Sequence, residues 1–304
     1  MPTQDTQSKE LSALLTEQRN PFSQEIDRLS TASILRIINA EDKLVPVAVE
    51  REIPYIERAV DLIVECFRGG GHLVYVGAGT SGRLGVLDAA ECPPTFGTVP
   101  EMIRAVIAGG QAAVFESQEG VEDDESKAIR DIESEHLSDV DVVCGIAASR
   151  RTPYVVAAIN RARELGAKTI YITTNPRSSF NLDVDVAICP EVGPEVIMGS
   201  TRMKSGSAQK FVLNMLSTAA MIKLGKVYEN MMIDLQLKNK KLLARAERIV
   251  SLATGVDGNA AAKTLQGANG HVKTAIVMIA ANVSAEEARS RLAKADGFVR
   301  LAIG

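Results

Sequence analysis

Short apolar runs recur along the middle of the chain, and stretches with helical spacing separate them. Runs of this length, bounded by glycine or polar residues, predict buried strands. The predicted strands lie at 73–76, 102–108, 140–146, 169–172 and 184–188. The clearest helix between them is predicted at 153–165. Strands that alternate with helices are typical of an α/β fold with a doubly wound parallel sheet.

Helical patterns flank this alternating region on both sides. Before it, Ser30 or Thr31 is expected to cap one helix, and a second is predicted at 45–67 with a disturbance at Pro54. After it, a long helix is expected at 231–250. Three short helices at 260–265, 271–281 and 285–293 would then form a small C-terminal module.

The pattern therefore divides the chain into three predicted parts. Residues 1–54 form an N-terminal helical segment, 55–225 the sheet domain, and 226–304 a C-terminal helical region that contains the small module. At 304 residues, the chain is long enough for a substantial core.

Composition narrows the classes of partner and the compartment. The net charge of -4 gives no footprint for nucleic acid. No apolar run approaches the ~18 residues of a membrane span, and the start lacks a basic region followed by an apolar one. Four scattered cysteines suit a reducing compartment, so we expect a cytoplasmic protein. The three histidines have no cysteine or carboxylate at ligand spacing, so no metal site is predicted.

A glycine-rich loop follows the first predicted strand. Gly77, Gly79 and Gly82 fit the G-x-G-x-x-G pattern of dinucleotide sites. The acid that would hold a ribose is missing, because the next strand ends in Ala-Gly-Gly, and no Gly-Lys-Ser/Thr follows. Thr80, Ser81 and Arg83 instead offer hydroxyls and a guanidinium. These groups suit the terminal phosphate of a small molecule.

Two further loops repeat this theme. One contains Ser149 and Thr152, and the other contains Ser200, Arg202 and Lys204. Each loop places serine or threonine at a helix start, where simple N-capping is the alternative reading. All three loops carry arginine and are expected at one sheet edge, which favours a phosphosugar site.

Two acidic positions are candidates for proton transfer. Glu91 precedes Pro93-Pro94, which we expect to end the helix and hold Glu91 in a fixed loop. Glu122 opens an acidic run, 122–125, after the second predicted strand. Two carboxylates in different environments can divide acid and base roles. Alternatively, Glu91 is a solvated residue at a helix end, and the acidic run 122–125 is a helix start that the helix dipole favours.

Long segments of the chain resemble the N-acetylmuramic acid 6-phosphate etherases. The segments that carry the resemblance most specifically are VGAGTSGRLG at 76–85, ECPPT at 91–95 and GSTRMKSG at 199–206. The likeness extends over nearly the whole chain and includes Thr16-Glu17, NAEDK at 39–43, GIAAS at 145–149, NMLST at 214–218 and KTAIVM at 273–278.

This resemblance implies a sugar isomerase (SIS) fold, a homodimer and no cofactor. It implies cleavage of the lactyl ether of N-acetylmuramic acid 6-phosphate with water, giving N-acetylglucosamine 6-phosphate and D-lactate. The implied route opens the sugar to its aldehyde, removes the C2 proton, eliminates the ether and adds water. The setting would be recycling of peptidoglycan sugars.

The matched motifs also suggest a role for each candidate residue. Glu91 would be the acid that protonates the departing lactyl oxygen, and Glu122 the base at C2. The phosphate would be held by the first two loops, through Thr80, Ser81, Arg83, Ser149 and Thr152. We assign the sugar or the lactyl carboxylate to the third loop, through Ser200, Arg202 and Lys204.

One position departs from the family pattern. The second loop of the family reads Ala-Ala-Ser-Gly-Arg-Thr-Pro, and Arg150 stands in the place of its glycine. Arginine loses the conformational freedom and small size of glycine but adds a charge that can pair with phosphate. Our hypothesis is that Arg150 impairs phosphate binding, which an unchanged KM in Arg150→Gly would contradict.

Three other functions compete with the etherase. The first is a non-catalytic phosphosugar-binding regulator, since the glucokinase regulatory protein has a similar loop. Retention of both Glu91 and Glu122 favours the enzyme. The second is a phosphosugar isomerase, which would release no lactate. A nicotinamide dehydrogenase fits least, because the ribose acid is absent.

Overall fold

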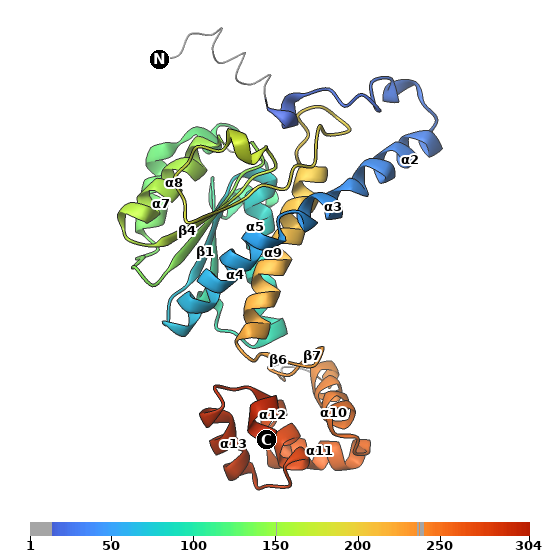
Figure 1. Ribbon diagram of the computed structural model, residues 1–304, viewed down its shortest axis with the longest axis vertical. Helices are drawn as coiled ribbons and strands as arrows, with labels where there is room; N and C mark the ends of the chain where they lie inside the picture. The colour runs from blue at the N-terminus through green and yellow to red at the C-terminus, as the bar shows by residue number, and fades with distance from the viewer. Residues whose placement is uncertain (1–13, 150, 236, 238–239) are drawn as a thin grey trace. The chain divides into compact units, whose positions relative to one another are not determined.

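The computed structural model describes residues 14–149, 151–235, 237 and 240–304 (Figure 1), so Arg150 lies outside the described residues. The described chain forms two compact units. The first contains the residues up to Ala89 together with Glu101–Leu216, and the second contains Ala90–Pro100 and Ser217–Gly304.

A five-stranded parallel sheet forms the centre of the first unit. Its strands are β1 (Leu73–Gly77), β2 (Ile103–Ile107), β3 (Val142–Ile146), β4 (Lys168–Ile172) and β5 (Val186–Ile188). Their order is β2-β1-β3-β4-β5, with every neighbouring pair parallel. All five strands lie where the apolar runs predict them, and the doubly wound α/β fold is confirmed.

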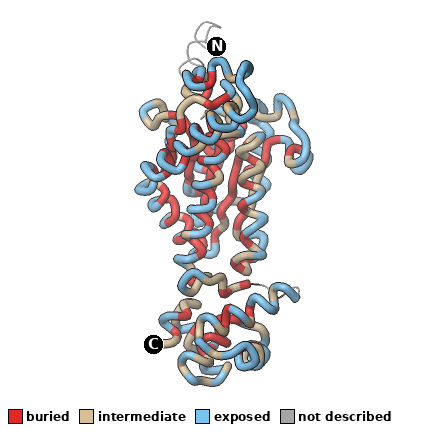
Figure 2. The backbone as a smooth tube through the Cα atoms, turned by 90° about the vertical axis from the view of Figure 1, so that its right-hand side faces the viewer, coloured by how far each residue is buried: buried red, intermediate tan, exposed pale blue. Residues whose placement is uncertain are grey.

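Helices cover both faces of this sheet. One face is covered by α7 (Glu125–Glu133) and α8 (Pro153–Glu164), and α4 (Ile53–Arg68) lies on the other (Figure 1). Figure 2 shows the buried backbone of the strands between exposed outer helix faces. Every residue of β1 and β3 is buried, as expected for a strand covered on both sides.

The helix predicted at 45–67 is divided into two helices, so its continuity was wrong, while the disturbance predicted at Pro54 is confirmed. After α2 (Thr31–Asp42), which Ser30 caps by accepting a bond from the Ser33 amide, the chain forms α3 (Leu44–Glu50) and then α4. Pro54 explains the break. A proline inside one continuous helix would remove a hydrogen bond and clash with the carbonyl four residues earlier. In the first turn of α4, its missing N–H leaves no bond unmade.

Pro93 and Pro94 do not end a helix, contrary to expectation. The helix α5 (Gly79–Phe96) continues through both of them, and the Gly97 amide still donates to the Pro93 carbonyl at 3.0 Å. The φ of proline is already helical, so both prolines lie within α5, although each lacks an amide donor. Glu91 therefore lies on a helix and not in a loop.

The remaining short elements of the first unit connect these layers. They are α6 (Ala112–Phe115) and single 3-10 turns at Leu15–Glu17, Ile26–Arg28, Val121–Asp123 and Arg177–Ser179. A further 3-10 turn, Pro100–Met102, and the long helix α9, Lys204–Lys223, each have residues in both units. No described helix is long and apolar enough to span a bilayer.

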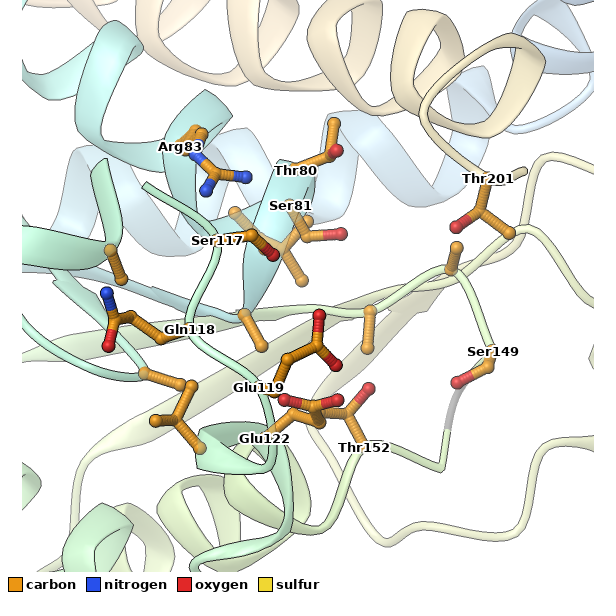
Figure 3. Close-up of a pocket in the computed structure, with 18 of the residues that line it drawn as sticks. Thr80, Ser81, Arg83, Ser117, Gln118, Glu119, Glu122, Ser149, Thr152 and Thr201 are labelled. Carbon is orange, nitrogen blue, oxygen red and sulfur yellow. The ribbon is translucent and has the colours of Figure 1, made fainter. Parts of the chain in front are cut away.

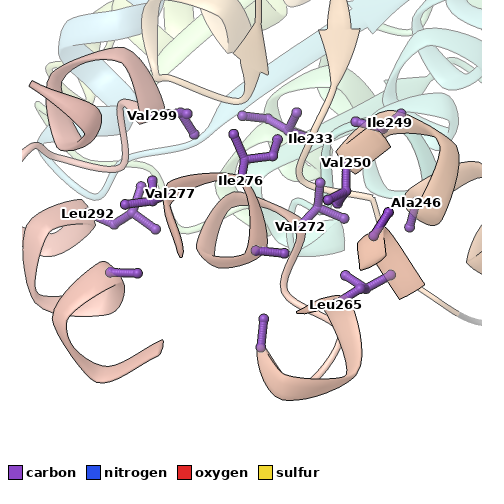
Figure 4. Close-up of a cluster of buried hydrophobic side chains, with 14 of the residues drawn as sticks. Ile233, Ala246, Ile249, Val250, Leu265, Val272, Ile276, Val277, Leu292 and Val299 are labelled. Atoms are coloured by element: carbon purple, nitrogen blue, oxygen red, sulfur yellow. The ribbon is translucent and has the colours of Figure 1, made fainter. Parts of the chain in front are cut away.

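The second unit is mostly helical. It contains the antiparallel pair β6 (Val227–Tyr228) and β7 (Met231–Met232), followed by α10 (Lys240–Thr254), α11 (Gly258–Gly267), α12 (Val272–Ala280), α13 (Ala285–Lys294) and α14 (Val299–Ile303). The helix predicted at 231–250 was wrong at its start, because Met231 and Met232 form β7 in a hairpin with Glu229 at φ 53°, and α10 is described over Lys240–Thr254. The three short helices are confirmed, and α14 adds a fourth. Their apolar faces meet in one core around Val250, Ile276 and Val277 (Figure 4).

Candidate active site

A cavity of about 290 Å³ opens at the carboxyl ends of β1, β2 and β3 (Figure 3). It is lined by Ala78 to Ser81 after β1, Ala108 after β2, and Ala147 to Ser149 after β3. The carboxyl edge of a parallel sheet is where α/β folds bind ligands. Two of the three predicted loops thus meet in one cavity.

The first loop packs tightly between β1 and α5. A side chain at Gly77 would bring a Cβ to 2.6 Å from the Gly82 amide nitrogen, so only glycine allows this approach. Thr80 and Ser81 lie in the first turn of α5 and line the cavity. Ser81 Oγ donates to Gln209 Oε1 at 3.0 Å. The hydroxyls and the helix N-terminus together suit an anion.

Arg83 also lines the cavity, and backbone carbonyls accept from two of the five N–H donors of its guanidinium. Nε donates to the Val114 carbonyl at 3.0 Å, and Nη2 donates to the Glu116 carbonyl at 3.3 Å. Arg83 therefore fixes the segment 114–116, which precedes Glu119 and Glu122 in the wall of the cavity.

Two buried side chains hold the backbone of the second loop in place. Thr173 Oγ1 and Asn175 Nδ2 each donate to the Ala148 carbonyl at 2.8 Å. Both residues are buried, so the loop is anchored to the end of β4. Ser149 and Thr152 line the cavity, with Thr152 at the start of α8.

Among the described residues, three carboxylates line this cavity. Glu122, on the 3-10 turn Val121–Asp123, is half-buried, and Glu119 is exposed (Figure 3). Glu17 comes from the far N-terminal part of the chain and is also half-buried. The sequence predicts Glu122 as a site residue but misses Glu17 and Glu119.

The position of Glu17 depends on bonds between residues far apart in sequence. The Gly199 amide donates to the Thr16 carbonyl at 3.1 Å, and the Leu15 amide donates to Asn175 Oδ1 at 3.1 Å. These bonds place Glu17 beside Gly199 in the cavity wall. The one sequence signal for Glu17 is its presence in the Thr16-Glu17 pair of the family resemblance.

The third loop enters the site only in part. Gly199 and Thr201 line the cavity, whereas Ser200, Arg202 and Lys204 are not among its described lining residues. Lys204 is 1% exposed, and its Nζ donates to Glu41 Oε2 at 2.6 Å.

A second carboxylate holds the backbone at this point. Glu195 accepts from the amides of Lys204 and Ser205 at 2.9 Å each. The structure therefore holds Lys204 in the interior of the unit and does not bring it to the cavity.

Glu91 is also absent from the described lining of this cavity. It is exposed on α5, eleven residues and thus about three turns beyond Thr80. It belongs to the part of α5 that clusters with the second unit.

Possible metal ligands and thiols were also located among the described residues. The described residues contain no group of three or more histidines, cysteines and carboxylates placed to bind a metal ion. All four cysteines are buried, and burial raises the pKa of the Cys66 thiol to about 12.

Comparison with known proteins identifies the family of the chain. The family model for the SIS domain matches residues 123–219, and the model for the N-terminal SIS domain of glucokinase regulatory protein matches residues 55–163. An N-acetylmuramic acid 6-phosphate etherase of Salinibacter ruber is 57% identical over all of this chain and 98% of its own length.

Two more etherases of the same name show similar agreement. That of Symbiobacterium thermophilum is 58% identical over 90% of this chain and 91% of its own length. That of a Geobacillus species is 52% identical over 96% of this chain and 99% of its own length. With a SIS fold and this identity over nearly its whole length, the chain belongs to the N-acetylmuramic acid 6-phosphate etherase family.

Proposed function

We propose that the protein cleaves the D-lactyl ether of N-acetylmuramic acid 6-phosphate with water, releasing N-acetylglucosamine 6-phosphate and D-lactate. The observation that carries this proposal is the placement of the Glu122 carboxylate in one cavity with the hydroxyls of Thr80, Ser81 and Ser149. A phosphate site alone would serve a regulator. A carboxylate in the same cavity also supplies a proton acceptor.

The phosphate is proposed to bind where the two loops meet helix starts. Thr80 and Ser81 begin α5, and Thr152 precedes α8. Hydroxyl donors and the partial positive charge of two helix N-termini stabilise phosphate without a lysine. Arg83 supports this site by holding the neighbouring segment.

The chemistry follows from the open-chain form of the sugar. Its C1 aldehyde makes the C2 proton acidic, and Glu122 is the proposed base that removes it. The electrons form a C2–C3 double bond as the C3–O bond of the lactyl ether breaks. A general acid protonates the departing oxygen, because an alkoxide is a poor leaving group. Water then adds at C3, and C2 is reprotonated.

Glu91 remains the proposed general acid on the strength of its ECPPT motif. Glu17 and Glu119 are the other carboxylates that the cavity itself offers. Replacing each of these three carboxylates in turn identifies the acid, because loss of the acid blocks departure of lactate but leaves removal of the C2 proton intact.

We further propose a cytoplasmic homodimer that acts in recycling of peptidoglycan sugars. Phe211, Met215 and Ile222 are exposed at spacings of four and seven residues on α9 and so share one face of that helix. An exposed apolar stripe of this kind favours contact with a second copy. The buried free cysteines suit a reducing compartment.

Release of D-lactate from N-acetylmuramic acid 6-phosphate tests the proposal. We expect stoichiometric D-lactate and N-acetylglucosamine 6-phosphate from the unmodified protein, and loss of both in Glu122→Gln. Binding of the phosphosugar without turnover would support the regulator. Conversion of a phosphosugar without lactate would support the isomerase.

A further inference from the structure

A second cavity, of about 520 Å³, lies entirely within the second unit. It is lined by Gly97, Lys226, residues 233–235, 270–273, Leu292, Ala293 and Gly297. Its size falls within the range of small-molecule sites, ~300–1,000 Å³. The etherase chemistry proposed above uses none of these residues, so this cavity needs an explanation of its own.

The charges around this cavity do not balance. Lys226 Nζ lies 3.0 Å and Lys273 Nζ lies 2.8 Å from the same oxygen, Asp234 Oδ2. Among the described residues that line the cavity, Asp234 is the single acidic side chain. Two ammonium groups thus share one carboxylate, and one positive charge is left over.

This excess charge is partly removed from water. The side chains of Lys273, Asp234 and Lys226 are 8%, 13% and 24% exposed. A charge held in a poorly solvated site is costly unless a partner of opposite sign accompanies it. An anion bound in the cavity would supply that partner.

Backbone groups at the cavity also favour the binding of an anion. Val272 and Lys273, the first two residues of the nine-residue helix α12, line the cavity. The N-terminus of a helix carries a partial positive charge and amide donors. Gly297, at φ +79°, keeps space open next to the lysine, since a Cβ there would lie 3.4 Å from Lys273 Nζ.

Apolar side chains form the rest of the wall. Ile233, Val272 and Leu292 are buried in the core of the unit and also border the cavity (Figure 4). They would contact a carbon skeleton but offer no donors. We infer that this cavity binds a small organic anion, whose carboxylate or phosphate group contacts Lys226 and Lys273.

Amide NMR spectra of the full chain test this site separately from the first cavity. Inorganic phosphate and acetate are titrated in turn, and the signals of Val272, Lys273 and Gly297 are followed beside that of Ser81. We expect saturating shifts at the first three positions. The probe that saturates them at the lower concentration identifies phosphate or carboxylate as the preferred group.

Two variants and a control test which side chains bind the anion. Lys226→Met is expected to weaken binding at these signals about tenfold or more. Asp234→Asn, which removes the competing carboxylate, should tighten it. Lys263→Met, an exposed lysine on α11, is the matched control and should leave binding unchanged.

Either of two results would overturn the inference. One is that shifts occur at Ser81 only. The other is that Lys226→Met binds the probe as tightly as the unmodified protein. Neither result depends on whether the protein is an etherase, because the readout needs no turnover.

Discussion

Lys204 in the first unit and Lys273 in the second are both buried lysines, but they differ in how their charge is neutralised. Lys204 has Glu41 as a partner, one cation for one carboxylate. Lys273 shares Asp234 with Lys226. A balanced pair serves to hold the chain together, whereas an unbalanced pair leaves charge available for a ligand. The ratio of charges therefore separates a structural lysine from a candidate binding lysine.

The two cavities differ in the charged groups that line them. The first contains hydroxyls with Glu17, Glu119 and Glu122, and the second contains two lysines over one aspartate. Binding an anion requires donors alone, and both cavities have them. Moving a proton on the bound sugar also requires an acceptor that faces the ligand, which we propose only for the first.

Replacing Glu122 should produce the largest effect. Glu122→Gln keeps the shape of the side chain but removes the base, and general-base catalysis contributes roughly 10²–10⁴-fold. We expect kcat for lactate release to fall by about 10³-fold, with phosphate binding in the second cavity unchanged. Asp123→Asn, an exposed neighbour outside the cavity lining, is the control. Equal losses in both variants would contradict the role of Glu122.

Breaking the balanced pair should be the next largest effect. Lys204→Met leaves the buried Glu41 carboxylate with Asn20, which donates to it at 2.7 Å, but without its cation. Removing one partner of a buried ion pair typically costs about 3–5 kcal/mol. Chemical denaturation should show this loss of stability, and the double variant Glu41→Gln/Lys204→Met should recover part of it. A loss under about 1 kcal/mol, the range of exposed pairs, would show that the pair is not structural.

Removing a hydroxyl from the first cavity should have a smaller effect. Ser81→Ala deletes one proposed phosphate donor, and a hydrogen bond to a charged group is worth about 1.5–3 kcal/mol. We expect KM for the phosphosugar to rise roughly tenfold or more. Ser207→Ala, on the exposed face of α9, should leave KM unchanged. An unchanged KM in Ser81→Ala would place the phosphate elsewhere.

The smallest predicted effect concerns His271 in the second cavity. Burial lowers the pKa of His271, and the positive charges of Lys273 and Arg289 act in the same direction, against the opposite effect of Asp234. The unfolded chain therefore binds this proton more readily than the folded one, and stability falls as the pH drops below about 6.5. His271→Gln should flatten this pH dependence of unfolding. The exposed His136→Asn should not, and a slope unaffected by His271→Gln would refute the assignment.

Local pattern predicts most of the sheet correctly. β1 and β3 are buried on both faces, so their apolar runs reveal them directly. Helix continuity is harder to predict, because one proline can begin a helix, as Pro54 does, while another lies within one, as Pro93 does. The hairpin of β6 and β7 is not predicted from the sequence, because strands of two residues are too short to show an alternation of apolar and polar positions.

The candidate site shows where sequence information stops. Thr80, Ser81 and Ser149 follow strands that local pattern identifies, so their convergence can be predicted. Glu17 reaches the same cavity only through bonds to segments more than 150 residues away. The pairing of Lys204 with Glu41 likewise spans 163 residues, and a lysine in a polar loop gives no local sign that it is buried.

Deuterium exchange at C2 tests the central claim most directly. The protein is incubated with N-acetylmuramic acid 6-phosphate in D₂O, and the sugar is analysed for deuterium at C2 while lactate is assayed in parallel. With Glu122 as the base and Glu91 as the acid, Glu91→Gln should exchange C2 hydrogen while releasing little lactate. Glu122→Gln should do neither. Exchange at the unmodified rate in Glu122→Gln would contradict the role of Glu122 as the base in the first cavity.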